Sequence, residues 1–161
     1  MAEPVIGRAI LRRGREKPVR QRHPWVFSGA IAEMQGDPAP GDLVEVVNAH
    51  GRFLARGFYN PHSQIRVRLL SWDANQPIDA DFWQDKMQRA IDGRNLIAGD
   101  TNARRLIFAE ADGLPGLVVD QYGRYLVMQC LTWGMAQRRE QMADLLVDLL
   151  QPEAILERSD A

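Results

Sequence analysis

The stretch that most restricts the fold of this 161-residue chain runs from residue 41 to residue 71, GDLVEVVNAHGRFLARGFYNPHSQIRVRLLS. Short apolar runs there predict strands at 43–47, 53–59 and 64–70, separated by turn formers. In the last strand Arg66 and Arg68 alternate with apolar residues, so one face is apolar and the other carries guanidinium groups. Short strands joined by tight turns indicate a small β-barrel.

The densest positive charge in the chain lies before this stretch. Seven basic residues fall between Arg8 and Arg22, and Pro18 and Pro24 leave room for at most a helical turn or two. The whole chain carries a net charge of −1, but residues 1–75 hold eleven Arg or Lys against seven Asp or Glu. The chain is therefore no general polycation, and its positive charge is concentrated in the first half.

The sequence changes character near residue 75, and we expect residues 1–75 and residues 76–161 to form two domains. In the second, Asp79 or Asp81 can cap a helix that Gly99 ends. Strands are expected at 105–110, 117–121 and 125–131, followed by a helix over 135–150 and a last strand in EAILER. This α-β-β-β-α-β order predicts an α+β domain with helices packed on one sheet face. The apolar side of the first helix would comprise Trp83, Met87, Ala90, Ile91 and Ala98.

Motifs that carry enzymatic chemistry are missing from this sequence. It contains no phosphate-binding loop, no GxGxxG, no HExxH and no GxSxG. The single cysteine, Cys130, excludes a disulfide framework and a multi-cysteine zinc site, and in an apolar strand it is expected to be inert. His23, His50 and His62 lie on three separate turns, so we expect no metal site.

Three acidic residues around the segment DGLPGLVVD offer an alternative, in which the chain is an enzyme in its own right. Glu110 and Asp112 would share a strand face and, with Asp120, supply carboxylates for acid–base work. The dipeptides at 112–113 and 115–116 are turn formers, however, which favours a structural hairpin connection. We therefore expect no catalytic residue in this chain.

No apolar run approaches the roughly 18 residues of a membrane span, and the first residues lack the order of a signal peptide. We therefore expect a cytoplasmic protein with no membrane partner.

Basic and aromatic residues together favour RNA binding. Cations neutralise phosphates, while Trp25, Phe27 and Tyr59 are able to stack on unpaired bases. Alternatively, Trp25 and Phe27 fill the barrel core and hold the loop in place, and this is the arrangement we expect. The expected RNA-binding residues are Arg12, Arg13, Arg15, Lys17, Arg20, Arg22, His23, Arg52, Arg56, Arg66 and Arg68.

Three blocks, RHPWVFSGAI, residues 41–71 and EADGLPGLVVDQYG, carry a family resemblance. The chain resembles the S-adenosylmethionine-dependent methyltransferases that modify carbon 5 of a cytosine in large-subunit rRNA. The resemblance implies an RNA-binding PUA domain up to about residue 73 and a central α+β domain from about residue 77 to residue 161. The family's C-terminal Rossmann-like catalytic domain has no counterpart here. S-adenosylmethionine is thus expected in a full-length parent and not in this chain, with large-subunit rRNA as the partner.

A second hypothesis assigns the chain a role in protein–protein interaction without direct RNA contact. Residues 76–161 hold nine Arg or Lys against fourteen Asp or Glu, and both predicted helices have apolar stripes. Such a module would pair two protomers as a homodimer or dock a catalytic domain. The chain ends directly after its last predicted strand, which suits either a natural terminus or a cut before another domain.

Overall fold

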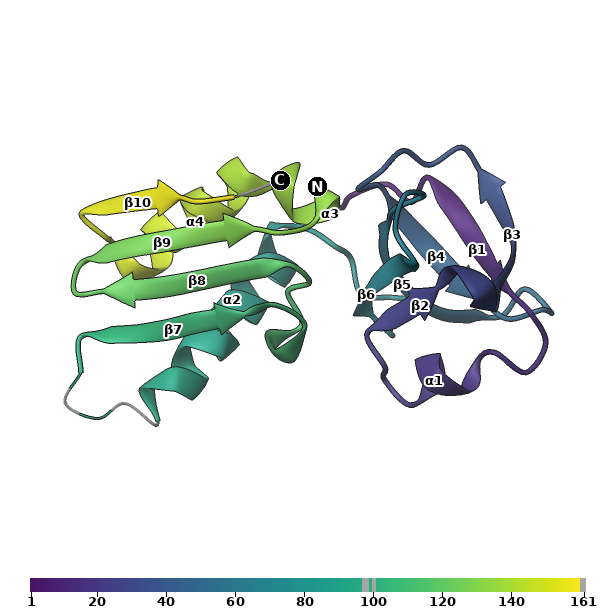
Figure 1. Ribbon diagram of the computed structural model, residues 1–161, viewed down its shortest axis with the longest axis horizontal. Coiled ribbons are helices and arrows are strands. Elements are labelled where there is room, and N and C mark those ends of the chain that lie inside the picture. Colours follow the sequence, from purple (N-terminus) through teal and green to yellow (C-terminus); the bar gives the residue numbers. More distant parts are fainter. Residues whose placement is uncertain (97–98, 100, 160–161) are drawn as a thin grey trace. The chain divides into compact units, whose positions relative to one another are not determined.

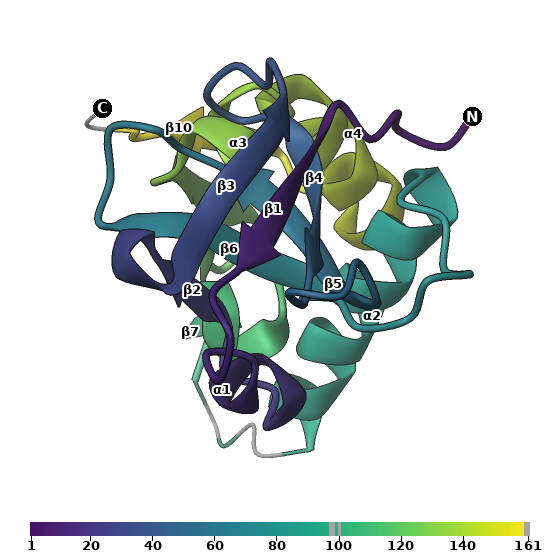
Figure 2. The same ribbon diagram turned by 90° about the vertical axis from the view of Figure 1, so that its right-hand side faces the viewer.

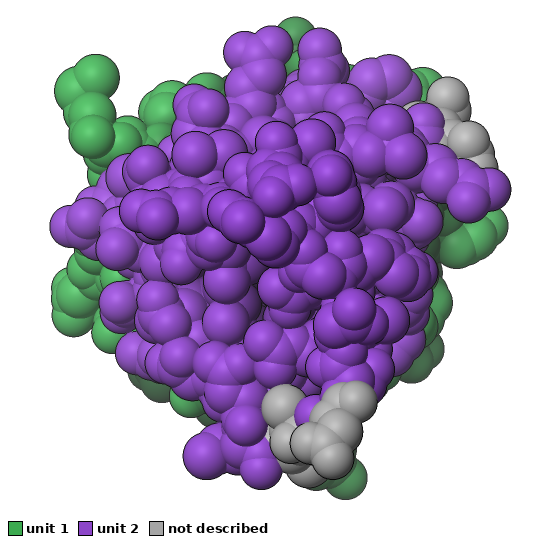
Figure 3. Space-filling model, turned by 90° about the vertical axis from the view of Figure 1, so that its left-hand side faces the viewer, with its two compact units in different colours: residues 1–78 green, residues 79–161 purple. Residues whose placement is uncertain are grey.

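The structure, a computed structural model, describes residues 1–96, 99 and 101–159. It divides into two compact units, residues 1–78 (unit 1) and residues 79–161 (unit 2), which are coloured separately in Figure 3. This division falls three residues after the expected position. The reason is that the Arg56 guanidinium donates hydrogen bonds to the carbonyl oxygens of Ala74 at 2.8 Å and Gln76 at 3.0 Å, which holds this segment to unit 1.

Unit 1 is built on one six-stranded sheet in the order β2-β6-β5-β4-β1-β3, seen in Figure 2. β2 and β3 are the two edge strands, yet only the 3-10 turn η1 (Ser28–Ala30) separates them along the chain. The sheet must therefore curl until its edges approach each other, which confirms the predicted small barrel. Its strands are β1 (Gly7–Leu11), β2 (Trp25–Phe27), β3 (Ile31–Gly36), β4 (Leu43–Val47), β5 (Phe53–Tyr59) and β6 (Ile65–Ser71).

The curled sheet encloses a core of small and β-branched side chains. Val46, Ala55 and Val67 are fully buried there, in agreement with the alternation read from the sequence. Neighbouring backbones approach closely at Gly57, where an added Cβ would lie 2.1 Å from the carbonyl oxygen of Arg68. Only glycine fits at this point, because the clash would be with backbone rather than with a flexible side chain.

Unit 2 is a four-stranded sheet, β10-β9-β8-β7, with the helices α2 and α4 on one face (Figure 1). β7, β8 and β9 form an antiparallel meander, while β10 pairs in parallel with β9 after the helical crossover. The α+β prediction is therefore confirmed. The elements are α2 (Ala80–Asn95), β7 (Ala103–Phe108), η2 (Ala109–Asp112), β8 (Leu117–Tyr122), β9 (Tyr125–Cys130), α3 (Trp133–Ala136), α4 (Arg139–Leu150) and β10 (Ala154–Glu157).

The helices of unit 2 differ in detail from the expectation. Of the two candidate caps, Asp79 takes the role, since its Oδ1 accepts a hydrogen bond from the backbone N–H of Phe82 at 3.0 Å. The helix α2 ends at Asn95, and Ala98 lies outside the described residues. The single helix predicted over 135–150 is two helices, because the backbone at Arg138 leaves helical geometry with φ −107° and ψ 11°.

The apolar stripes of the two long helices form the core of unit 2. Trp83 and Met87 of α2 and Met142 and Leu146 of α4 are completely buried. These stripes were one of the two grounds for the interaction-module hypothesis, and they do not support it, because they pack within their own unit. Exposed apolar side chains lie instead on the opposite sheet face, at Phe108, Tyr122, Tyr125 and Leu156.

Candidate nucleic-acid interface

The basic segment of unit 1 lies on the connection from β1 to β2, which includes the short helix α1 (Lys17–Arg20). Its length agrees with the limit set by the two prolines. Val19 points inward and is 2% exposed, and its carbonyl oxygen accepts a hydrogen bond from the indole Nε1 of Trp72 at 2.7 Å. The segment is therefore fixed by its apolar side and by Trp72. All six of its predicted RNA-binding cations are exposed: Arg12, Arg13, Arg15, Lys17, Arg20 and Arg22.

The end of the basic segment is conformationally restricted. Arg22 has a φ of 65°, in the left-handed region, and its guanidinium lies 5.2 Å from the centroid of the Trp72 ring. A cation over an indole face is attracted by the ring quadrupole. Trp72 thus holds the segment at two points, and this role was missed by the sequence reasoning. The available signal in the sequence was the position of Trp72, directly after the last strand of the barrel.

The aromatic residues of β2 are arranged differently from the expectation. Val26 is 2% exposed and enters the core, whereas Phe27 is 47% exposed and Trp25 is only partly buried. The prediction that Phe27 fills the core is therefore wrong. The physical reason is the two-residue period of a strand, which turns the middle residue of WVF inward and its neighbours outward.

His23, Trp25 and Phe27 form an aromatic cluster on the outside of the barrel. The rings of Trp25 and Phe27 meet edge to face with centroids 6.3 Å apart, and the His23 ring lies 5.9 Å from Trp25. The backbone N–H of Trp25 lies 3.2 Å from Nδ1 of His23, which holds the imidazole in place. Arg68 pairs opposite Trp25 and its guanidinium lies 5.7 Å from that ring.

A pocket of about 180 Å³ opens between α1 and β2, and the three rings of this cluster are part of its lining. Its lining is mainly apolar, with the cation Arg15 and the imidazole of His23 among the contributors. A cavity of about 150 Å³ is large enough for benzene, so one aromatic ring fits here. The complete lining is Arg15, Pro18, Val19, His23, Trp25, Val26, Phe27 and Ala30.

The arginines on the later strands are not equivalent. Arg56 has a side chain only 12% exposed, and it spans Glu45 and the loop carbonyls described above. We omit it from the interface because its guanidinium is already engaged inside unit 1. Arg66 donates a hydrogen bond to the carbonyl oxygen of Pro61, and Arg52 is exposed in the turn before β5.

The acidic residues of unit 2 serve its structure. Asp112 accepts two hydrogen bonds from Arg94, at 3.1 and 2.8 Å, and a third from the backbone N–H of Phe108 at 2.6 Å. Asp120 accepts two from Arg105, at 2.8 and 3.0 Å. Glu110 and Asp112 lie on the turn η2 rather than on a strand face, so the pairing on which an acid–base role depended is not formed.

The remaining chemical groups that were considered add no site. Cys130 is fully buried, and burial raises the pKa of its thiol to about 11. In the described part of the chain, no three His, Cys, Asp or Glu side chains are grouped so as to hold a metal ion. None of the helices within the described ranges has the length and hydropathy of a transmembrane span.

Comparison with known proteins gives both a domain family and named relatives. Residues 9–72 match the family described as PUA-like domain. Ribosomal RNA large subunit methyltransferase I of Klebsiella pneumoniae (strain 342) is 39% identical over 162 residues, which cover 99% of this chain and 40% of that protein. The protein of the same name from Cronobacter sakazakii is 42% identical over 155 residues, or 95% of this chain and 39% of the relative. The chain thus spans about two fifths of the length of these relatives.

Solved structures show the same fold. A provisionally assigned SAM-dependent methyltransferase from Streptococcus mutans is similar with a TM-score of 0.81, over 94% of this chain and 40% of that chain. A second provisionally assigned methyltransferase, complexed with SAH, gives a TM-score of 0.82 over the same shares. Both are 15% identical to this chain, so the likeness concerns the fold alone.

These names raise the question of whether the chain holds S-adenosylmethionine itself. In nucleotide-binding α/β folds the cofactor lies where a glycine-rich turn leads from a strand into a helix. The corresponding turn here, between β9 and α3, consists of Leu131 and Thr132, and Thr132 is used to cap α3 through the backbone N–H of Met135. This turn therefore lacks the glycine-rich geometry that holds such a cofactor, and we derive no chemical step through it.

Proposed function

We propose that this chain is the RNA-binding portion of an rRNA methyltransferase, because residues 9–72 match the PUA-like domain family and relatives that align with nearly the whole chain are named rRNA methyltransferases. Its substrate is large-subunit rRNA in the cytoplasm, and the parent enzyme transfers a methyl group from S-adenosylmethionine to carbon 5 of a cytosine. The chain positions the RNA, and other residues of the parent perform the transfer.

The observation that carries this proposal is the exposed, fixed surface at α1 and β2. Six cations project from a segment whose backbone is tied to the barrel, beside an aromatic cluster and a pocket of one-ring size. Because the backbone of this segment is already fixed, less conformational freedom is lost when its cations bind phosphates, and the exposed aromatic rings supply stacking. Together these features suit RNA with unpaired bases, since sequence-tolerant stacking and phosphate contacts act at the same place.

The proposal is tested by the affinity of the full chain for an rRNA stem-loop as a function of salt. Neutralised phosphates release counterions, so affinity falls as salt rises. The double substitution Arg13→Ala with Arg20→Ala should weaken binding and lower the salt slope by about two. Arg89→Ala with Arg124→Ala, two exposed arginines of unit 2, is the matched control and should change neither quantity. Unchanged affinity in the first variant would overturn the proposal.

A further inference from the structure

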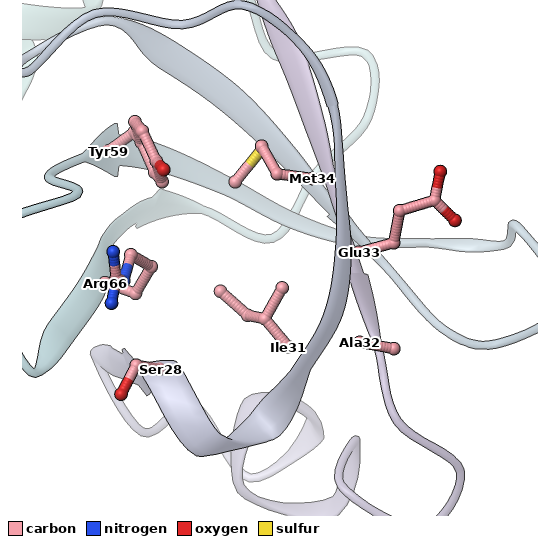
Figure 4. Close-up of a pocket in the computed structure, with 7 residues that line it drawn as sticks. All are labelled: Ser28, Ile31, Ala32, Glu33, Met34, Tyr59 and Arg66. Atoms are coloured by element: carbon pink, nitrogen blue, oxygen red, sulfur yellow. The ribbon is translucent and has the colours of Figure 1, made fainter.

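Unit 1 has a second hollow in addition to the pocket between α1 and β2. It has a volume of about 170 Å³ and opens between β3 and the neighbouring ends of β5 and β6 (Figure 4). Ser28 lines this hollow and Phe27 lines the first pocket, so consecutive residues belong to the two. Its lining is Ser28, Ile31, Ala32, Glu33, Met34, Tyr59 and Arg66.

The walls of this hollow are of two kinds. Figure 4 shows Tyr59 and Arg66 together on one side, facing Ile31 and Met34 of β3 on the other. The carboxylate of Glu33 points away from the hollow, and its Oε1 lies 3.4 Å from the Nε2 of Gln35. The interior therefore presents one aromatic ring, apolar side chains and the guanidinium of Arg66, while the carboxylate of Glu33 points away from it.

The polar wall is held in place before any ligand arrives. Arg66 donates through one Nη to the carbonyl oxygen of Pro61, which orients the planar guanidinium. The backbone of Tyr59 is bonded on both sides, donating to Asp42 O at 2.9 Å and accepting from Gly41 N at 2.7 Å. At the floor, the Ser28 hydroxyl donates to Gln64 Oε1 at 3.0 Å. A hollow with walls fixed in this way is preorganised, which reduces the entropy lost on binding.

The chemistry of these walls suits one flat ring that carries hydrogen-bond acceptors. A ring inserted between Tyr59 and Met34 gains stacking and dispersion on both faces, and the volume matches a single ring. A guanidinium only donates hydrogen bonds, so it favours carbonyl oxygens and ring nitrogens on the edge of the ring. Uracil and cytosine are single rings that carry a carbonyl oxygen, whereas adenine and guanine are fused two-ring bases that exceed this volume.

We propose that this hollow binds one unpaired pyrimidine base of the RNA, next to a base held by the pocket at α1 and β2. This inference rests on the proposed function and extends it. Two consecutive bases of one RNA strand would then occupy the two pockets, one in the pocket lined by Phe27 and the other in the hollow lined by Ser28. Unit 1 then discriminates weakly among single-stranded sequences, and adenine is disfavoured at this position.

The test measures fluorescence anisotropy of labelled hexauridylate and hexaadenylate with the full chain. Arg66→Met keeps the aliphatic stem and removes the donors, so affinity for hexauridylate should fall about tenfold, while that for hexaadenylate stays within about twofold. Arg8→Met, a substitution of the same kind at an exposed arginine of β1, is the matched control and should change neither affinity.

Each outcome bears on one of the two proposals. If the unaltered chain binds RNA and Arg13→Ala with Arg20→Ala weakens it, but Arg66→Met lowers both affinities equally, the base pocket is overturned and the RNA-binding function stands. If the unaltered chain binds no RNA, both proposals are overturned. Should circular dichroism show that Arg66→Met is unfolded, Arg66→Lys replaces it, because it keeps the charge and loses the fork; full retention of the uridylate preference in that variant counts against the pocket.

Discussion

The basic segment of unit 1, residues 12–22, uses arginine differently from unit 2. In unit 2, Arg94, Arg105 and Arg124 each contact a carboxylate of the same unit, at 2.8 to 3.2 Å. In unit 1, no salt bridge within the described part of the chain joins any of the six cations of residues 12–22 to a carboxylate. An arginine paired with a carboxylate stabilises the fold, whereas arginines on a fixed segment without a carboxylate partner attract a polyanion. The number of arginines is therefore a poorer guide to RNA binding than their partners.

The strongest test of this contrast separates the stability of unit 2 from RNA binding by unit 1. Trp83 is completely buried in unit 2, so Trp83→Ala should lower the free energy of unfolding of that unit by about 3–5 kcal/mol. We expect RNA affinity to persist, because the cations belong to unit 1. Chemical denaturation monitored by circular dichroism, with binding measured in the same denaturant series, checks both. Loss of RNA affinity together with the unfolding of unit 2 would contradict this separation of roles between the two units.

A second test separates structure from recognition within β2. Val26→Ala should cost about 2 kcal/mol of stability, because a buried side chain is lost, with affinity little changed once the protein is folded. Phe27→Ala should leave stability within about 0.5 kcal/mol and weaken RNA binding by about 1–3 kcal/mol, because an exposed ring available for stacking is removed. Thermal melts and binding titrations of both variants are required. A large loss of stability in Phe27→Ala with unchanged RNA affinity would show that Phe27 contributes to the core and not to RNA binding.

A third test concerns what holds the basic segment. Trp72→Phe removes the indole N–H that bonds the carbonyl oxygen of Val19 and retains most of the apolar contact. We expect a loss of about 1 kcal/mol in stability and a modest rise in the dissociation constant, because the cations become less well fixed. Amide hydrogen exchange over residues 15–22 gives the local readout. Unaltered protection there would show that Val19 alone anchors the segment.

The smallest effect concerns the thiol of unit 2. The pKa of Cys130 is raised by burial to about 11, from a reference value of 9.0. Its protonated form is therefore favoured in the folded state, and this stability is fully present below pH 9 and is lost as the pH rises toward 11. The loss amounts to roughly 1 kcal/mol by pH 10. Urea denaturation of the unaltered chain and of Cys130→Ala between pH 8 and 10.5 measures it, and identical pH profiles would contradict the assignment.

Local patterns predicted much of the architecture. The strands at 43–47 and 53–59 agree with β4 and β5, and the α+β order of the second half agrees with the observed elements. Period-two alternation and turn residues act over a few positions, so a single sequence carries them. The error at Phe27 arose because the aromatic character of WVF was given more weight than its alternation. The break at Arg138 was missed because one apolar stripe continues across both helices.

By itself, the sequence determined which segments form strands and helices, where positive charge concentrates, and that no cofactor loop or nucleophilic motif is present. The tertiary structure alone decided which cations are available. The sequence does not distinguish Arg56 from Arg20. In the structure Arg56 bonds the loop at residues 74–76, whereas Arg20 is exposed. The partners of a guanidinium can come from positions distant along the chain, as Ala74 and Gln76 do for Arg56 and the Trp72 ring does for Arg22. Such contacts exist only once the strands have paired, because the pairing of β6 with β2 and with β5 is what brings those positions together.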